Sequence, residues 1–131
     1  MSADSKKRIL VIDDDAEIRA AMKNYLERKG FLVGGAPGDQ VATDLISAAN
    51  HSALMRYSLI VLDINLDQTN GVDLLEKLRE KKIVECPVIV LSGDFDPKDV
   101  PRSKALGVVS FLVKPVSGQK LEAAINEALA K

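Results

Sequence analysis

The chain has 131 residues, of which 47% are hydrophobic and 28% are charged, a balance typical of a folded globular domain and not of a disordered chain. Its formal net charge of −1 gives no bulk reason to bind nucleic acid, and its apolar runs are too short for a membrane span or a secretion signal. The single cysteine, Cys86, excludes an internal disulfide. We interpret it as structural, and we predict a cytoplasmic protein.

The chain begins with seven small, polar or charged residues, and we predict that residues 1–7 form a disordered tail before one domain over residues 8–131. The domain opens with an apolar run, residues 8–12, which fits a strand buried on both faces. Three aspartates come directly after this run. Apolar residues then recur with helical spacing up to Gly30, which is placed to end the helix.

Glycine marks the next part of the chain. Residues 31–33 predict a short strand, and the glycine-rich stretch 34–38 predicts a break after it. Asp39 is placed to cap a helix that ends near Asn50. The lone histidine, His51, follows in a predicted loop, and we interpret it as an exposed surface residue.

The most informative strand is the third. Residues 59–62 are apolar and run directly into Asp63, and a polar loop leads from there to Gly71. Open α/β sheets place their chemistry at the carboxyl ends of such strands. Asp63 is therefore a candidate functional group, although a strand-end aspartate can also do no more than begin a turn. Apolar residues after Gly71 predict another amphipathic helix.

Two further strands complete the predicted sheet. Residues 88–91 form an apolar run that ends at Ser92. Residues 108–113 form the last run, which ends at Lys114 and is followed by a proline. A short helix is predicted between these strands, and an amphipathic helix after them.

Five alternating strands and helices predict an α/β fold, a doubly wound five-stranded parallel sheet with helices on both faces. In such a sheet the carboxyl ends of the strands open on one edge, where the ligand crevice lies. Polar residues from four strand ends should therefore converge there. They are Asp13, Asp14, Asp63, Ser92 and Lys114.

These side chains form a chemically consistent set. Clustered carboxylates repel one another unless a cation lies among them, and oxygen ligands without Cys or His suit Mg²⁺ or Mn²⁺. Lys114 offers a further positive charge and Ser92 a hydroxyl, both suited to the oxygens of a phosphoryl group. Asp63 is best placed to act as the nucleophile and form an aspartyl phosphate. Taken one at a time, these residues could serve only as a helix cap, a turn residue or the residue at a strand exit. Such roles do not explain why all of them converge at one edge of the sheet.

In this order, the residues resemble the receiver domain of two-component response regulators, over nearly the whole chain from about Arg8. That family ends its first strand in an acidic pair, its third in the phosphoacceptor aspartate, its fourth in Ser or Thr, and its fifth in Lys-Pro. Many members carry an aromatic switch residue three positions before the lysine, and a glycine follows the loop after strand three. The matching residues here are Asp13 with Asp14, Asp63, Ser92, Lys114 with Pro115, Phe111 and Gly71.

The resemblance implies a flavodoxin-like strand order, 2-1-3-4-5, and a phosphorylation-dependent signalling switch. Asp63 would accept a phosphoryl group from a sensor histidine kinase, a histidine phosphotransfer protein or a small phosphodonor. Mg²⁺ would be held by Asp14, by Asp63, by the backbone carbonyl of Asn65 and, through water, by Asp13.

The resemblance also implies a relay. Ser92 and Lys114 would sense the phosphoryl group, and Phe111 would turn inward behind Ser92, so that a downstream protein target, which the sequence does not identify, recognises the changed face. The bond between Lys114 and Pro115 is often cis in such domains, and we expect this here. We further expect a stand-alone receiver, similar to chemotaxis regulators, with no separate catalytic domain, no direct nucleic-acid contact and no membrane insertion.

Three features depart from the family pattern. The family usually has a proline four residues after the phosphoacceptor, where this chain has Asp67. The segment between Gly38 and Leu59 is a few residues longer than usual. Pro101 falls where the fourth helix usually runs, and proline inside a helix removes a hydrogen bond. We therefore predict a fourth helix that is short or begins near Pro101.

Two alternatives stay open. The order Asp13-x-Asp15, with a later Ser and Lys, resembles haloacid-dehalogenase-type phosphatases, which would make Asp13 the nucleophile but leave Asp63 unexplained. A degenerate receiver that acts only as a protein-binding module, without phosphorylation, is the second.

Overall fold

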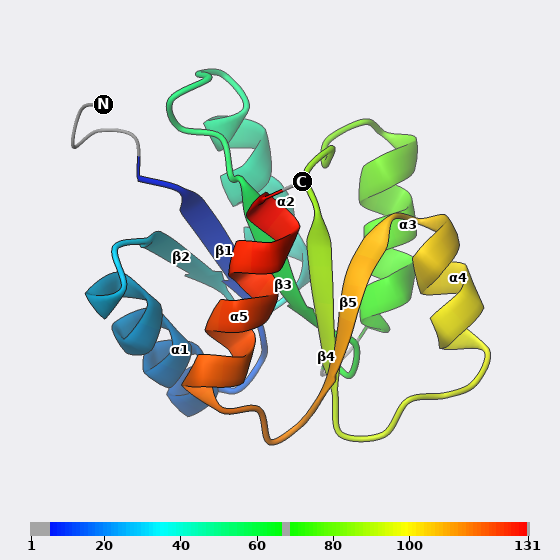
Figure 1. Ribbon diagram of the computed structural model, residues 1–131. Coiled ribbons are helices and arrows are strands. Elements are labelled where there is room, and N and C mark those ends of the chain that lie inside the picture. The colour runs from blue at the N-terminus through cyan, green and yellow to red at the C-terminus, as the bar shows by residue number, and fades with distance from the viewer. Residues whose placement is uncertain (1–5, 67–68, 131) are drawn as a thin grey trace.

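A computed structural model describes residues 6–66 and 69–130 of the protein. Its centre is a five-stranded parallel sheet with the strand order β2-β1-β3-β4-β5, and helices cover both faces (Figure 1). The predicted fold class and strand order are therefore confirmed. The elements in chain order are β1 (Arg8–Ile12), α1 (Ala16–Arg28), β2 (Leu32–Ala36), α2 (Asp39–Ala49), β3 (Leu59–Asp63), α3 (Gly71–Glu80), β4 (Val88–Ser92), α4 (Asp99–Ala105), β5 (Val108–Val113) and α5 (Gly118–Leu129).

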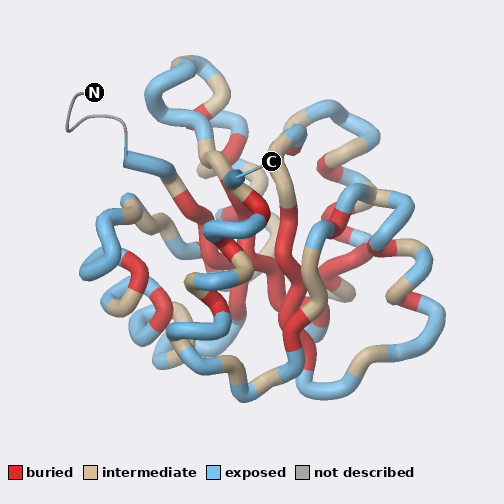
Figure 2. The backbone as a smooth tube through the Cα atoms, viewed as in Figure 1, coloured by how far each residue is buried: buried red, intermediate tan, exposed pale blue. Residues whose placement is uncertain are grey.

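Strands β3 and β4 are buried along their whole length, and Figure 2 shows such buried segments in red in the middle of the molecule. Because successive side chains of a strand point to opposite faces, each apolar run supplies two separate cores. Leu10, Ile60 and Val90 belong to the core beneath α2 and α3. Val61 and Ile89 belong to the core beneath α1 and α5. Each such fully buried side chain contributes about 1.5–3 kcal/mol to the stability of the fold. This packing fixes the positions of the strand ends that carry the polar residues.

The predicted break at residues 34–38 is wrong in its first part, because β2 continues through Gly34 and Gly35 to Ala36. Both glycines pair in register with β1. A Cβ on Gly34 would lie 2.9 Å from the hydroxyl oxygen of Tyr57. Glycine within a strand often marks such a close approach, and here it leaves room for the tyrosine ring.

Asp39 is the first residue of α2, and Gly38 holds the capping position, so the predicted cap is also corrected. The Asp39 carboxylate instead accepts hydrogen bonds from Thr43 Oγ1 at 3.1 Å and from Lys77 Nζ at 3.1 Å. It thus joins the first turn of α2 to α3. Gly30 follows α1 with a φ of +96°, which confirms its role in ending that helix.

Helix α4 is short and begins two residues before Pro101, as predicted. Pro101 is the third residue of the helix, within the first turn, where backbone N–H groups have no partner inside the helix. The proline therefore costs no helical hydrogen bond. Arg102, the next residue, forms ion pairs with Asp73 and Glu76 of α3, which hold α4 beside α3.

Several predictions concern exposure. His51 is exposed and lies in a turn, as predicted. Cys86 is half-buried, and its structural role stays a prediction. Among residues 6–66 and 69–130, no helix combines the length and the apolar character needed to cross a membrane. Asp67 and most of the predicted tail 1–7 lie outside the described residues, so the expectations for them stay predictions.

Candidate functional site

The ends of β1, β3 and β5 bring three charged side chains together at one edge of the sheet. Asp13 directly follows β1, Asp63 ends β3, and both are buried, with 1% and 3% of their surface exposed. Lys114, directly after β5, donates from Nζ to Asp13 Oδ2 at 2.9 Å and to Asp63 Oδ2 at 3.0 Å. The predicted convergence of these residues is therefore present.

The second oxygen of each buried carboxylate is held by backbone. Asp13 Oδ1 accepts from the N–H of Asp15 at 2.9 Å, and Asp63 Oδ1 accepts from the N–H of Asn65 at 3.0 Å. Asp15 also caps α1, because its Oδ1 accepts from the N–H groups of Glu17 and Ile18. With both oxygens engaged, each carboxylate has one defined orientation.

Arg19 was missed by the sequence reasoning. Its Nη1 donates to the backbone carbonyl of Asp13 at 2.6 Å and so fixes the chain at the strand end. A cation in the first turn of α1 opposes the helix dipole, which favours negative charge there. This unfavourable position could have indicated from the sequence that Arg19 has a role other than stabilising the helix.

Asp14 completes a group of three carboxylates. One oxygen from each of Asp13, Asp14 and Asp63 lies within 4.8 Å of the others, and Asp14 is exposed on the solvent side. An all-oxygen set of this size suits a hard divalent cation that keeps part of its water shell. The residues therefore fit Mg²⁺ or Mn²⁺ by their chemistry.

Burial raises the pKa of Asp63, and hydrogen bonds from Lys114 and Asn65 offset this only in part. Burial also lowers the pKa of Lys114, but hydrogen bonds to Asp13 and Asp63 outweigh it, so that this pKa is raised overall. In an isolated ion pair the carboxylate pKa would fall. Here one ammonium is shared between two buried carboxylates, so the site is short of positive charge, and a bound cation would supply it.

Ser92 ends β4 and is fully buried, but its hydroxyl is directed to Asn65 and not to Asp63. Its Oγ donates to Asn65 Oδ1 at 2.8 Å and accepts from the N–H of Asp94 at 3.1 Å. Asn65 thus donates a backbone hydrogen bond to Asp63 and accepts a side-chain hydrogen bond from Ser92. The expected role of the Asn65 carbonyl in metal binding stays a prediction.

Phe111 is half-buried on β5 and packs edge-to-face against Phe95, with the ring centroids 5.9 Å apart and the planes at 71°. Phe95 lies in the loop after Ser92, so this pair connects that loop with β5. The sequence reasoning missed Phe95, although one aromatic residue in an otherwise polar loop was a usable signal. The Lys114–Pro115 bond beside the site is cis, as expected.

The loop after Asp63 returns to the site at Gly71. The Gly71 N–H donates to the carbonyl of Ile64 at 2.7 Å, and a Cβ on Gly71 would collide with the backbone oxygen of Asp63. Asn70 caps α3 by accepting from the N–H of Val72 at 2.7 Å. Asn70 was missed as well, although asparagine just before an apolar helical repeat is a common cap.

Sequence comparison identifies the family of this chain. The family model described as the response regulator receiver domain matches residues 9–126. The chain belongs to this family. Receiver domains are the signalling domains of two-component response regulators, and phosphorylation-based switching is their general function.

Curated relatives are response regulators of greater length. The chain is 28% identical to the transcriptional regulatory protein ResD of Bacillus subtilis over 132 residues, which cover 100% of this chain and 51% of ResD. It is 30% identical to PdtaR of Mycobacterium tuberculosis over 127 residues, covering 95% of this chain and 58% of PdtaR. The chain therefore spans about half the length of these relatives.

Solved receiver structures have the same fold. A CheY-like receiver domain of Methanospirillum hungatei superimposes with a TM-score of 0.85 at 28% identity, covering 96% of this chain and 95% of that one. A response regulator receiver protein of Pseudomonas putida gives 0.83 at 31% identity, with coverage of 94% and 98%. The site described above thus lies in a receiver fold.

Proposed function

We propose that Asp63 accepts a phosphoryl group from a histidine kinase or a histidine phosphotransfer protein, with Mg²⁺, and that the change is relayed to a partner protein. The observation that supports this proposal best is that the Lys114 ammonium contacts both buried carboxylates, Asp13 at 2.9 Å and Asp63 at 3.0 Å. A site with too little positive charge and a fixed carboxylate favours both a divalent cation and phosphoryl transfer. This intact set also favours phosphorylation over the binding-module alternative.

The residues of the chain divide the work of the transfer. Asp63 presents one oxygen to phosphorus, forming an O–P bond while the bond from phosphorus to the donor imidazole breaks and that nitrogen takes up a proton. The backbone N–H of Asn65 holds the Asp63 carboxylate in position. Lys114 neutralises charge on the phosphoryl oxygens. When bound by Asp13, Asp14 and Asp63, with the Asn65 carbonyl, Mg²⁺ would supply further neutralisation and orientation.

The relay begins at Ser92. A phosphoryl oxygen offers its hydroxyl a charged acceptor in place of the neutral Asn65 amide, and hydrogen bonds to charged groups are the stronger ones. Movement of Ser92 pulls the loop that carries Phe95, so the Phe95–Phe111 contact must repack. We propose that this repacked face is read by the partner, and that the protein hydrolyses its own aspartyl phosphate to reset the switch. The predictions of a cytoplasmic location and of no direct nucleic-acid contact stay predictions.

One experiment tests this function. The protein is incubated with Mg²⁺ and acetyl phosphate, and the acid-labile modification is located by mass spectrometry. We expect it on Asp63. A modification on Asp13 would instead support the phosphatase alternative. Failure of acetyl phosphate, phosphoramidate and a phosphorylated histidine phosphotransfer protein alike would support the binding module.

The metal assignment makes a separate prediction. Asp14→Ala should abolish Mg²⁺-dependent modification, because it removes the exposed carboxylate of the trio, while the fold stays intact since Asp14 is on the surface. Without Mg²⁺, the free energy of unfolding should change by no more than about 0.5 kcal/mol. Mg²⁺ should raise Tm in the parent protein and in the Glu17→Ala control, whose exposed carboxylate lies outside the trio, but not in Asp14→Ala. Retained modification in Asp14→Ala would contradict the assignment.

A further inference from the structure

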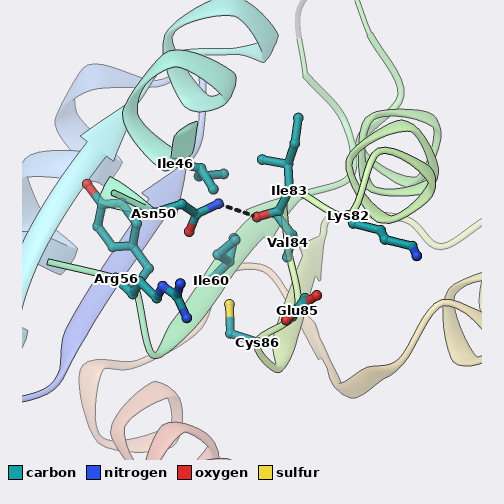
Figure 3. Close-up of a pocket in the computed structure, with 10 residues that line it drawn as sticks. Ile46, Asn50, Arg56, Ile60, Lys82, Ile83, Val84, Glu85 and Cys86 are labelled. Atoms are coloured by element: carbon teal, nitrogen blue, oxygen red, sulfur yellow. Dashed lines mark hydrogen bonds between the residues drawn. The ribbon is translucent and has the colours of Figure 1, made fainter. Parts of the chain in front are cut away.

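A second candidate site lies at the opposite edge of the sheet from Asp63. There the end of α2, the start of β3 and the loop between α3 and β4 enclose a cavity of about 410 Å³ (Figure 3). Pockets that bind small molecules typically measure roughly 300–1,000 Å³. The cavity is therefore large enough for a small ligand, and no step of the proposed phosphoryl transfer uses it.

The walls of the cavity are held together before any ligand arrives. Asn50, directly after α2, donates from Nδ2 to the carbonyl of Ile83 at 2.8 Å, the dashed line in Figure 3. This bond connects the α2 wall to the α3–β4 loop. The buried side chains of Ile46, Ile60 and Val84 supply apolar lining. A preformed apolar lining favours ligands with an apolar body, because little ordering is required on binding.

The polar groups of the cavity favour an anion. Figure 3 shows the Arg56 guanidinium beside Ile60 and Cys86. Among residues 6–66 and 69–130, no carboxylate lies within ion-pair distance of Arg56. Burial raises the pKa of Cys86 to about 11, so the thiol is neutral at physiological pH. Arg56, Lys82 and Glu85 all line the cavity from exposed positions, so water screens the three charges alike, and the two cations outnumber the one carboxylate.

We propose that this cavity binds a small organic anion, with its carboxylate on Arg56 and its apolar body against Ile46, Ile60 and Val84. Arg56 comes from the segment between Gly38 and Leu59, which the phosphorylation site leaves unused. The carboxylate–guanidinium contact can be bidentate, which gives both affinity and orientation. The proposal is independent of phosphorylation at Asp63.

A matched pair of probes tests the proposal. Indole-3-acetate and indole-3-acetamide have nearly the same size, but only the first is an anion. Each is titrated into ¹⁵N-labelled protein, and amide shifts are followed by NMR. We expect saturable shifts at residues 50–57 and 83–86, with indole-3-acetate binding roughly tenfold more tightly, the effect of one charge-assisted hydrogen bond. Arg56→Gln should lose this preference, whereas Arg28→Gln, an exposed cation at the end of α1, should retain it.

Several results would overturn the proposal. One is the absence of saturable shifts with either probe, and another is equal binding of acid and amide. Shifts confined to another surface, or full retention of acid preference in Arg56→Gln, would do the same. The NMR spectra also report whether each variant is folded, so loss of binding through unfolding is recognised directly. Because Asp63 is not involved, failure here leaves the proposed phosphorylation intact.

Discussion

Asp63→Asn is expected to abolish phosphoryl uptake by this protein. The carboxamide has almost the same size as the carboxylate, but only its oxygen can accept a hydrogen bond, so it keeps the contact from Lys114 or the contact from the Asn65 N–H and not both. It also loses the anionic oxygen that attacks phosphorus. The measurement is incorporation from acetyl phosphate with Mg²⁺, and we expect none above background, whereas a defect in positioning alone would only slow the reaction.

Asp94→Asn is the matched control for this variant. Asp94 lies two residues after Ser92, and its side chain is exposed, so the change removes a carboxylate in the loop beyond β4 without touching the proposed acceptor. We expect it to be modified as the parent protein is. Persistent modification of Asp63→Asn at another residue, with parent-like kinetics, would show that Asp63 is not the acceptor.

The same Asp63→Asn variant should be more stable than the parent near neutral pH without Mg²⁺. Burial raises the pKa of Asp63, so the folded state holds this proton more tightly than the unfolded state does. The resulting stabilisation is complete below the unfolded pKa and is lost as pH rises through the folded pKa. The neutral asparagine avoids this loss. We expect a gain in Tm of a few degrees at neutral pH that disappears on acidification below about pH 4.

Much of the site was predictable because it rests on strand periodicity and sheet geometry. Asp13, Asp63 and Lys114 each follow a continuous apolar run, and parallel strands bring such run ends to one edge. Their meeting within 3.0 Å needed no knowledge of side-chain packing. The short α4 was predictable for a similar reason, since the restriction that Pro101 imposes is local.

What the sequence did not reveal depends on contacts between distant residues. Glycine fits at position 34 of β2 because a Cβ there would lie 2.9 Å from the Tyr57 hydroxyl oxygen, and no local signal names that tyrosine. Ser92 donates a hydrogen bond to Asn65, which is 27 residues away in the chain. The direction of the Ser92 hydroxyl is therefore determined by how the two loops pack against each other. Such pairings are fixed by tertiary structure, which routinely overrides local preference.

Gly71→Ala is expected to have the largest effect on stability among these variants. A Cβ at this position would collide with the backbone oxygen of Asp63 and lie 2.9 Å from the Cα of Ile64. Both neighbours are main-chain atoms at the end of a fully buried strand, so neither can move without shifting the strand. Overpacking of this kind costs about 1–3 kcal/mol, and more where the backbone must move. We expect a fall in Tm of roughly 10 °C.

The same collision should impair chemistry, because the shifted atoms belong to Asp63 itself. A displacement of 1 Å at a reacting group can cost on the order of 10²-fold in rate, so modification by acetyl phosphate should slow sharply even below the new Tm. Gly93→Ala is the control: it follows Ser92, yet its Cβ would meet nothing within 4 Å, and its stability should stay within about 0.5 kcal/mol of the parent. Equal Tm values for the two alanine variants would mean that the Asp63 backbone yields, and that Gly71 is not what holds the acceptor in place.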